Sequence, residues 1–143
     1  MVGVVVTGHN LIADGLVSAC DMIIGHHNHC KTVCLTDGVD SFSKKLYETL
    51  DEMFNEYEAV IVVSDVKGGT PFNQSLRYKL EKAKSNMQII SGMNLPLFME
   101  LVMQLEFADD AEQLAKSVVE TGAQSVALEE LDEEADDDED DVI

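Results

Sequence analysis

Tryptophan is absent from this 143-residue chain, and it has only two prolines and three cysteines. An odd number of cysteines does not suggest a disulfide framework and fits a reducing compartment. No apolar run approaches the roughly 20 residues of a membrane span. The apolar run at residues 2–6 is too short for a signal peptide and has no basic residues before it. These absences predict a cytoplasmic protein, and the length of 143 residues predicts a single domain, long enough to bury a core.

Basic residues are also scarce: 9 Lys and Arg stand against 28 Asp and Glu, for a net charge of -19. Eleven of the acidic residues lie in the last fifteen positions, so the rest of the chain carries about -8. A surface without clustered Lys and Arg is a poor match for nucleic acid, so we expect basic proteins or small molecules as partners. The acidic segment has almost nothing to bury, and we expect residues 129–143 to be disordered.

Apolar runs alternate with segments of helical periodicity along residues 1–128. Strands are predicted at residues 2–6, 32–36, 60–64, 87–91 and 125–128, and helices at 11–25, 41–57, 70–84, 95–105 and 111–121. Ser41 and Thr70 are the predicted N-caps of two helices, and Gly122 is expected to stop the last. Three of the strands are continuously apolar, which is typical of an open, mostly parallel α/β sheet with helices on both faces.

Two of these strands lead into residues that carry chemistry. His9 follows the strand at 2–6, and Asp65 directly follows the strand at 60–64. Carboxyl ends of parallel strands share one edge, where open α/β sheets bind their ligands. An aspartate that holds one ring nitrogen fixes the tautomer and leaves the other nucleophilic near pH 7. The alternatives are a histidine that caps a helix or meets solvent, and an aspartate that only forms a turn.

A double glycine, Gly68-Gly69, follows Asp65 and precedes Thr70, where a helix is predicted to begin. Backbone amides at a helix N-terminus attract anions, and glycines leave them open to a phosphate. The structural alternative is a tight turn that needs positive φ. The spacing is not that of a Walker loop, and no GxGxxG follows the first strand, so a nucleotide site has little support.

Three histidines and two cysteines gather between His26 and Cys34. Zinc accepts both ligand types, but the spacing matches no standard zinc finger. Cys34 falls within a predicted strand, where cysteine usually packs as a small apolar residue. We therefore expect a solvent-exposed turn and no metal site here.

The sequence resembles the enzyme IIA domain of the mannose family of the bacterial phosphoenolpyruvate-dependent sugar phosphotransferase system. The matching pieces are Val4-Val5-Val6-Thr7-Gly8-His9, Val63-Ser64-Asp65-Val66-Lys67-Gly68-Gly69-Thr70-Pro71-Phe72-Asn73 and Ile90-Ser91-Gly92-Met93-Asn94-Leu95-Pro96. The resemblance covers roughly residues 2–128. It implies that His9 is phosphorylated, that Asp65 is its hydrogen-bonded partner, and that Gly69 and Thr70 contact the phosphoryl group.

The resemblance also implies partners. Such a domain accepts phosphate from the phosphocarrier protein HPr and passes it to a IIB domain or subunit, which phosphorylates sugar entering through membrane components (IIC and IID). It forms homodimers by exchanging a C-terminal edge strand, here residues 125–128. We expect no metal or other cofactor, because protein dipoles can stabilise the charge of the phosphoryl group. Because an acidic tail stands where some relatives continue into a linker and a IIB domain, we expect a separate IIB subunit.

Two other functions stay open. The fold could carry phosphate on His9 as a signal and dock on a transporter or regulator without passing the phosphate on. A nucleotide or flavin binder of flavodoxin type is the other alternative, but the chain lacks a phosphate loop after its first strand and a tryptophan for stacking.

Overall fold

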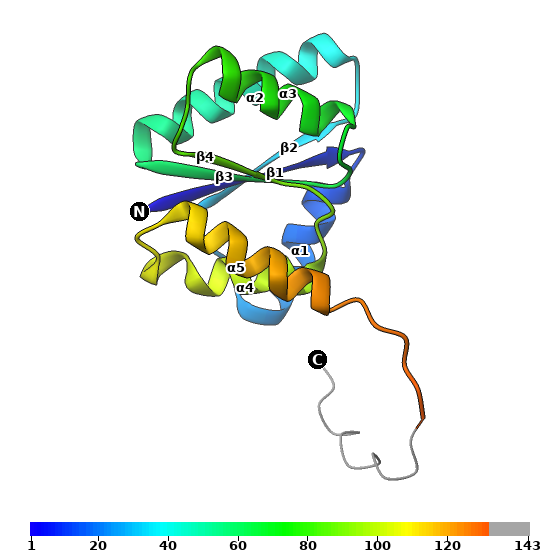
Figure 1. Cartoon of the computed structure of the whole chain (residues 1–143). Coiled ribbons are helices and arrows are strands. Elements are labelled where there is room, and N and C mark those ends of the chain that lie inside the picture. Colours follow the sequence, from blue (N-terminus) through cyan, green and yellow to red (C-terminus); the bar gives the residue numbers. More distant parts are fainter. Residues whose placement is uncertain (132–143) are drawn as a thin grey trace.

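The computed structural model describes residues 1–131, so most of the acidic segment that we predict to be disordered lies outside the described residues. Within them the sheet has four strands: β1 (Val2–His9), β2 (Cys30–Leu35), β3 (Ala59–Ser64) and β4 (Met87–Ile90). Their order is β2-β1-β3-β4, and every neighbouring pair is parallel (Figure 1). The predicted parallel α/β sheet is confirmed.

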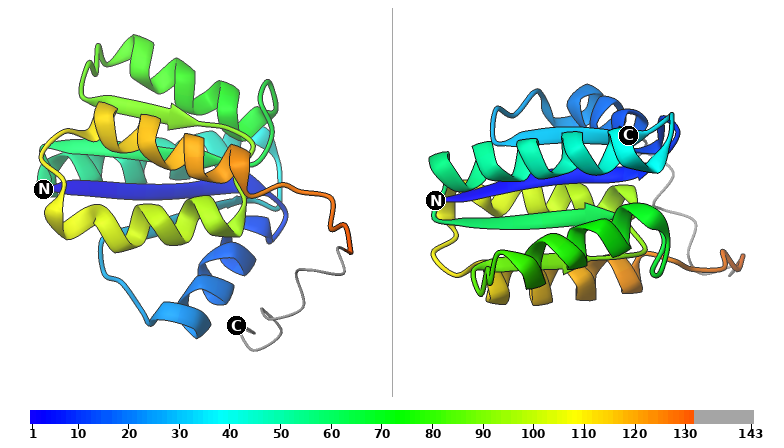
Figure 2. Two further views of the ribbon diagram at one scale, coloured as in Figure 1. Left: turned by 60° about the horizontal axis from the view of Figure 1, so that its bottom comes forward. Right: turned by 90° about the horizontal axis from the view of Figure 1, so that it is seen from above.

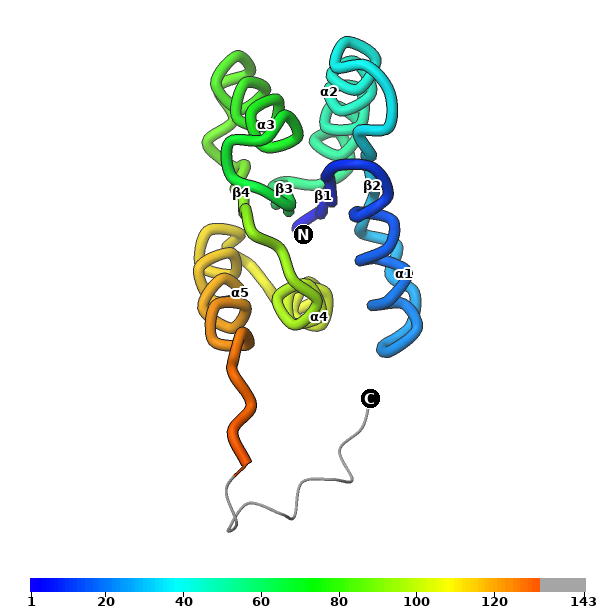
Figure 3. Tube along the Cα trace, turned by 90° about the vertical axis from the view of Figure 1, so that its right-hand side faces the viewer, coloured from blue at the N-terminus to red at the C-terminus, as the bar shows by residue number. Residues whose placement is uncertain are grey.

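Five α-helices join and cover the strands in the described part of the chain. They are α1 (Ile12–Ile24), α2 (Val39–Glu56), α3 (Thr70–Glu81), α4 (Leu95–Gln104) and α5 (Ala111–Gln124), with a short 3-10 helix, η1 (Leu105–Phe107), after α4. Helices α2 and α3 cover one face of the sheet, and α1, α4 and α5 cover the other (Figures 1 and 3). None of the described helices has both the length and the apolar character needed to cross a membrane.

The core divides into two halves because successive strand side chains point to opposite faces. In β1, Val2, Val4 and Val6 pack with α1, α4 and α5, whereas Val5 packs with α2 and α3. By the same alternation His9 lies on the α2 and α3 side of the sheet.

Both predicted N-caps are wrong, because Ser41 and Thr70 lie inside their helices, α2 and α3, rather than just before them. Gly38 caps α2 and Gly69 caps α3, both with extended backbone. The Ser41 hydroxyl instead donates to the Gly38 carbonyl at 3.0 Å, inside the first turn. Thr70 is the first helical residue of α3, next to Pro71, a residue that suits the first turn of a helix.

Gly122 does not end α5, which continues to Gln124. A Cβ at Gly122 would stand 2.8 Å from the Leu97 side chain, closer than real contacts allow. The glycine therefore serves the close approach of α4 and α5, a tertiary requirement that its place in the sequence does not reveal.

The predicted fifth strand is wrong for the single chain: among the described residues, 125–128 join no sheet. After α5 the chain leaves the body from the helix layer instead of turning back to the edge of the sheet at β4 (Figure 2). Val126 is 78% exposed and Leu128 is 85% exposed, so this segment presents apolar side chains to solvent. The exchange of this segment between two copies stays a prediction.

Candidate functional site

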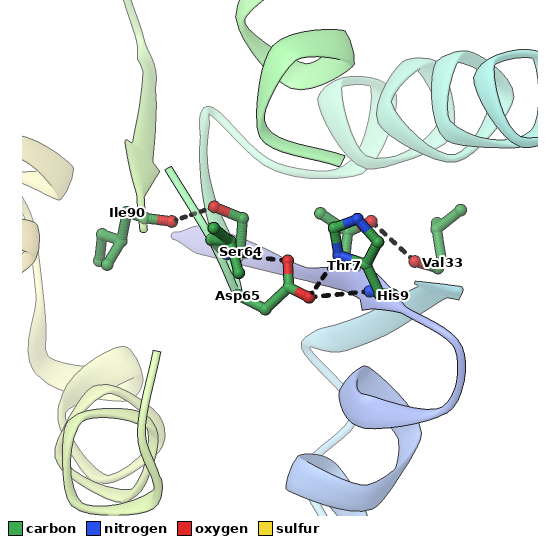
Figure 4. A network of polar contacts seen from close by, with 7 residues as sticks. Thr7, His9, Val33, Ser64, Asp65 and Ile90 are labelled. Carbon is green, nitrogen blue, oxygen red and sulfur yellow. Dashed lines mark hydrogen bonds and ion pairs between the residues drawn. The ribbon is translucent and has the colours of Figure 1, made fainter. Parts of the chain in front are cut away.

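His9 and Asp65 meet at the carboxyl edge of the sheet, as we expected from their positions after two strands. His9 is the last residue of β1, and Asp65 follows the last residue of the adjacent β3. The His9 Nδ1 atom lies 2.8 Å from the Asp65 Oδ2 atom, and the His9 backbone N–H donates to the same oxygen at 2.9 Å (Figure 4). One carboxylate oxygen thus fixes both the backbone and the ring of His9.

The environment of the pair keeps Asp65 ionised. Its side chain is only 7% exposed, while that of His9 is 49% exposed. Burial raises the pKa of Asp65, but hydrogen bonds from the His9 amide and ring and from the Val66 amide outweigh it and leave the pKa below its ordinary value. An ionised carboxylate can only accept hydrogen bonds, so the proton sits on Nδ1 and the lone pair on Nε2. The half-exposed ring therefore offers Nε2 as a nucleophile.

Two glycines make room for this pair. A Cβ at Gly8 would stand 2.4 Å from the Ile12 Cγ2 atom and 3.1 Å from the Asp65 carboxylate. At Gly69 a Cβ would stand 2.9 Å from the His9 Cε1 atom and 3.6 Å from Nε2. Sequence reasoning selected Gly69 but missed Gly8, whose only signal is a glycine between two strand residues.

The turn that follows Asp65 directs the start of α3 toward His9. The Gly69 N–H donates to the Val66 carbonyl at 3.1 Å, and Gly68 has a φ of 82°, the left-handed region that glycine tolerates best. The Asn73 side chain closes the turn by donating to the Gly68 carbonyl at 2.9 Å. Because its amide is used in this turn, Gly69 contributes open space beside the ring rather than a free N–H.

Free amides come from the next residues. The first helical bond of α3 runs from the Asn73 N–H to the Gly69 carbonyl at 2.9 Å, and Pro71 has no N–H. In the described part of the chain the amides of Thr70 and Phe72 have no backbone acceptor, as is usual in a first helical turn. These amides and the positive end of the helix dipole suit an anion next to His9.

The loop after β4 bonds to the backbone of Ser64 and Asp65, on the side of β3 away from β1. The Gly92 N–H donates to the Asp65 carbonyl at 3.1 Å, and the Met93 N–H donates to the Ser64 carbonyl at 3.2 Å. Gly92 has a φ of 74°, which lets this loop turn sharply toward β3.

The histidines of the His26–Cys34 segment do not converge on one point. Each of their Nδ1 atoms has its own partner: Asp21 for His26, the Gly25 carbonyl for His27 and the Tyr57 hydroxyl for His29. Burial, with Cys20 and Asp21 nearby, raises the pKa of the Cys30 thiol to about 12, so this residue stays protonated. No group of three metal-binding side chains exists among residues 1–131.

Comparison with known proteins decides the family. The family model described as "PTS system fructose IIA component" matches residues 3–119. This chain belongs to that family. It is a IIA component of the mannose and fructose branch of the phosphotransferase system, whose members take part in phosphoryl transfer.

Individual relatives of this IIA component agree. The fructose-specific EIIA component of Bacillus subtilis is 28% identical over 104 residues, which are 71% of this chain and 69% of that protein. The mannose-specific EIIAB component of Escherichia coli is 26% identical over 132 residues, 87% of this chain but only 38% of that longer protein. The solved mannose/sorbose-specific IIA subunit of Enterococcus faecalis has the same fold, with a TM-score of 0.76 at 22% identity, over 92% of this chain and 96% of that one.

Proposed function

We propose that this IIA component is a phosphoryl carrier in sugar uptake, and that His9 accepts phosphate from HPr and passes it to a IIB domain or subunit. The observation that carries the proposal is the 2.8 Å contact between the His9 ring and the ionised carboxylate of Asp65. That contact leaves Nε2 as the nucleophile on the exposed side of the ring.

In the transfer step the Nε2 lone pair attacks phosphorus, and the bond between phosphorus and the donor breaks with its electron pair going to the donor. The proton stays on Nδ1, so the phosphorylated ring carries positive charge beside Asp65. The carboxylate stabilises this cation at 2.8 Å. Transfer to the acceptor is the reverse reaction, and no acid–base step is needed because placement and charge do most of the work.

The start of α3 supports the charge on the transferred group. The amides of Thr70 and Phe72 have no backbone acceptor in the described chain and are available to phosphoryl oxygens. Gly69 leaves open the space next to Cε1 and Nε2, which a side chain at that position would fill. Thr70 and Gly69 are thus assigned as phosphate-binding residues for different reasons, one through its amide and the other through its lack of a Cβ.

The surroundings of His9 suit a protein partner rather than a small molecule. Four apolar residues, Leu11, Ile12, Val39 and Val66, define an apolar collar: they lie at or just before the starts of α1 and α2 and in the turn after β3, and each residue is 48–64% exposed. Exposed apolar groups gathered beside a reactive residue are typical of a transient interface.

Two further features follow from the same proposal. The exposed Val126 and Leu128 suit a segment that pairs with β4 of a second copy, which would give a homodimer. Exchange with HPr and IIB, with IIC and IID in the membrane, would take place on the cytoplasmic side.

The test is to incubate the protein with phosphoenolpyruvate, enzyme I and HPr, and to map acid-labile phosphate by mass spectrometry. We expect one phosphate on His9, lost when a IIB partner is added. A label on another residue, or no label, would overturn the proposal. A label on His9 that no IIB partner removes would instead support a phosphohistidine that serves as a signal.

A further inference from the structure

Two buried hydroxyls lie directly below the His9–Asp65 pair. Thr7 precedes His9 by two residues in β1, and Ser64 directly precedes Asp65 in β3. Both residues are fully buried, although every other residue of β1 and β3 that is fully buried is apolar or glycine. They are also register partners in the β1–β3 pair, so they stand side by side across the centre of the sheet.

Each hydroxyl bonds outward to an edge strand. The Thr7 hydroxyl donates to the Val33 carbonyl of β2 at 2.7 Å, and the Ser64 hydroxyl donates to the Ile90 carbonyl of β4 at 2.7 Å (Figure 4). The remaining junction, between β1 and β3, is bridged by the two bonds from His9 to Asp65. Side-chain bonds therefore cross all three strand junctions at this edge of the sheet.

A hydroxyl at either position needs a reason, because valine fills a buried strand position equally well and has no polar group to satisfy. Val5 and Val62, one step lower on the same two strands, show the usual choice. The hydroxyls appear only where β1 and β3 reach the site. An end of a strand is less constrained than its middle. The His9–Asp65 contact joins the ends of β1 and β3 to each other, and the two hydroxyl bonds join the same ends to the outer strands β2 and β4.

We propose that Thr7 and Ser64 are positioning residues that set the spacing between His9 and Asp65 by tying the ends of β1 and β3 to the outer strands. The inference rests on the proposed function only for its kinetic consequence. With the hydroxyls in place, Asp65 meets the ring at the distance that fixes the proton on Nδ1. Without them the two strand ends move apart more freely, and the ring spends less time in the reactive tautomer.

The chain offers a matched control. Ser75 is also fully buried, and its hydroxyl also donates to a carbonyl, that of Pro71 at 2.8 Å. This bond lies within α3 and joins no two strands. Ser75→Ala therefore removes a buried hydroxyl bond of the same kind without releasing a strand end.

The experiment measures two quantities in Thr7→Val, Ser64→Ala and Ser75→Ala. The first is the rate of phosphoryl transfer from phosphorylated HPr as a function of HPr concentration. The second is the fraction of the Nδ1–H tautomer of His9, from nitrogen-15 NMR of the unphosphorylated protein. Thermal unfolding of each variant shows how much of any change comes from stability.

We expect Thr7→Val and Ser64→Ala to lower the transfer rate at saturating HPr about tenfold, since small misplacements of reacting groups are costly. The HPr concentration for half-maximal rate should not change, because the collar is untouched. Both variants should show a mixed tautomer, Thr7→Ser should restore the wild-type values, and Ser75→Ala should match wild type.

Wild-type rates and tautomer in both Thr7→Val and Ser64→Ala would overturn the inference, and so would an equal loss in Ser75→Ala. If one variant does not fold, the other decides the question in the same way. Failure of the proposed function has a different signature, since wild-type protein would then take no phosphate from HPr. The tautomer measurement needs no phosphate and tests the positioning role even in that case.

Discussion

The two ends of the sheet both carry histidine, and they differ in what surrounds it. At the carboxyl edge a single ring, that of His9, contacts a buried carboxylate and has glycine beside it. At the amino end, residues 26–29 of the His26–Cys34 segment supply three rings, each bonded to a different neighbour. In the described structure the three rings do not point to a common position, whereas the single ring of His9 is held by Asp65 and exposes the nitrogen that we propose as the nucleophile.

The difference shows that orientation, rather than the number of reactive side chains, makes a site here. His27 bonds a carbonyl two residues away in its own loop, so its ring is fixed only by local backbone. His9 is fixed by a residue 56 positions away along the chain. Such a contact persists only in the folded protein, and it sets the protonation of the ring through a charge that the fold has buried.

The largest effect should come from removing the oriented ring. We expect His9→Ala to abolish labelling by phosphorylated HPr. No other histidine in the described part of the chain has a buried carboxylate in contact with its Nδ1 atom. His27→Ala, at the other end of the sheet, should label like wild type. Phosphate mapping by mass spectrometry checks both, and thermal unfolding should show that both variants fold. If His9→Ala still took up phosphate, the oriented ring would not be required, and His9 would not differ in function from the histidines at the amino end of the sheet.

The next largest effect concerns the carboxylate. Asp65→Asn keeps the shape of the side chain but loses its charge, so the tautomer is no longer fixed and the phosphorylated ring loses its counter-charge. We expect transfer to slow on the order of 100-fold. Rapid-mixing kinetics with phosphorylated HPr measure this, and a rate within twofold of wild type would show that Asp65 is not needed.

The same variant should change the pH dependence of stability. The pKa of Asp65 is lower in the folded protein than its ordinary value, so its ionised form stabilises the fold. This contribution is complete above the unfolded value of about 3.9 and is lost as the pH falls through the lower folded value. Unfolding measured across this range should therefore show wild type and Asp65→Asn converging in acid. A gap that stays constant from pH 7 to acid would contradict the lowered pKa.

A smaller effect should follow from filling the space beside the ring. In Gly69→Ala the new Cβ would stand 2.9 Å from the His9 Cε1 atom, so we expect the ring to shift and transfer to slow about tenfold. Gly38→Ala is the matched control, because Gly38 also caps a helix with extended backbone and a Cβ there meets nothing within 4 Å. Equal rates in the two variants would show that the contact with His9 is unimportant.

The smallest effect is expected at the amino end. Adding zinc to the protein should shift thermal unfolding by no more than about 1 °C, since a ligand stabilises a fold only by binding it. Calorimetric titration with zinc should likewise show no stoichiometric binding, and His29→Ala should behave as wild type in both measurements. Tight binding lost in His29→Ala would give the His26–Cys34 segment a function after all.

Local patterns in the sequence determined most of the architecture. Continuous apolar runs identified the strands, helical periodicity identified the helices, and the positions of His9, Asp65 and Gly69 after two strands predicted that they would meet. These predictions succeeded because strand and helix periodicity and turn chemistry depend on residues near one another in the chain. Local sequence did not predict the strand ends: β1 extends to His9 itself, because β2 continues to pair with it as far as the register pair of His9 and Leu35.

Only the tertiary structure decided which residues must be small and which polar groups meet. Gly8 is needed because the Ile12 side chain and the Asp65 carboxylate both approach it, and Gly122 because Leu97 packs against it. The fifth predicted strand pairs with no strand in the described chain, although its pattern of residues is strand-like. The outward bonds of Thr7 and Ser64 also join segments 26 residues apart. Such contacts depend on the order of strands in the sheet, and strand order is set by the packing of the whole domain rather than by any local run of residues.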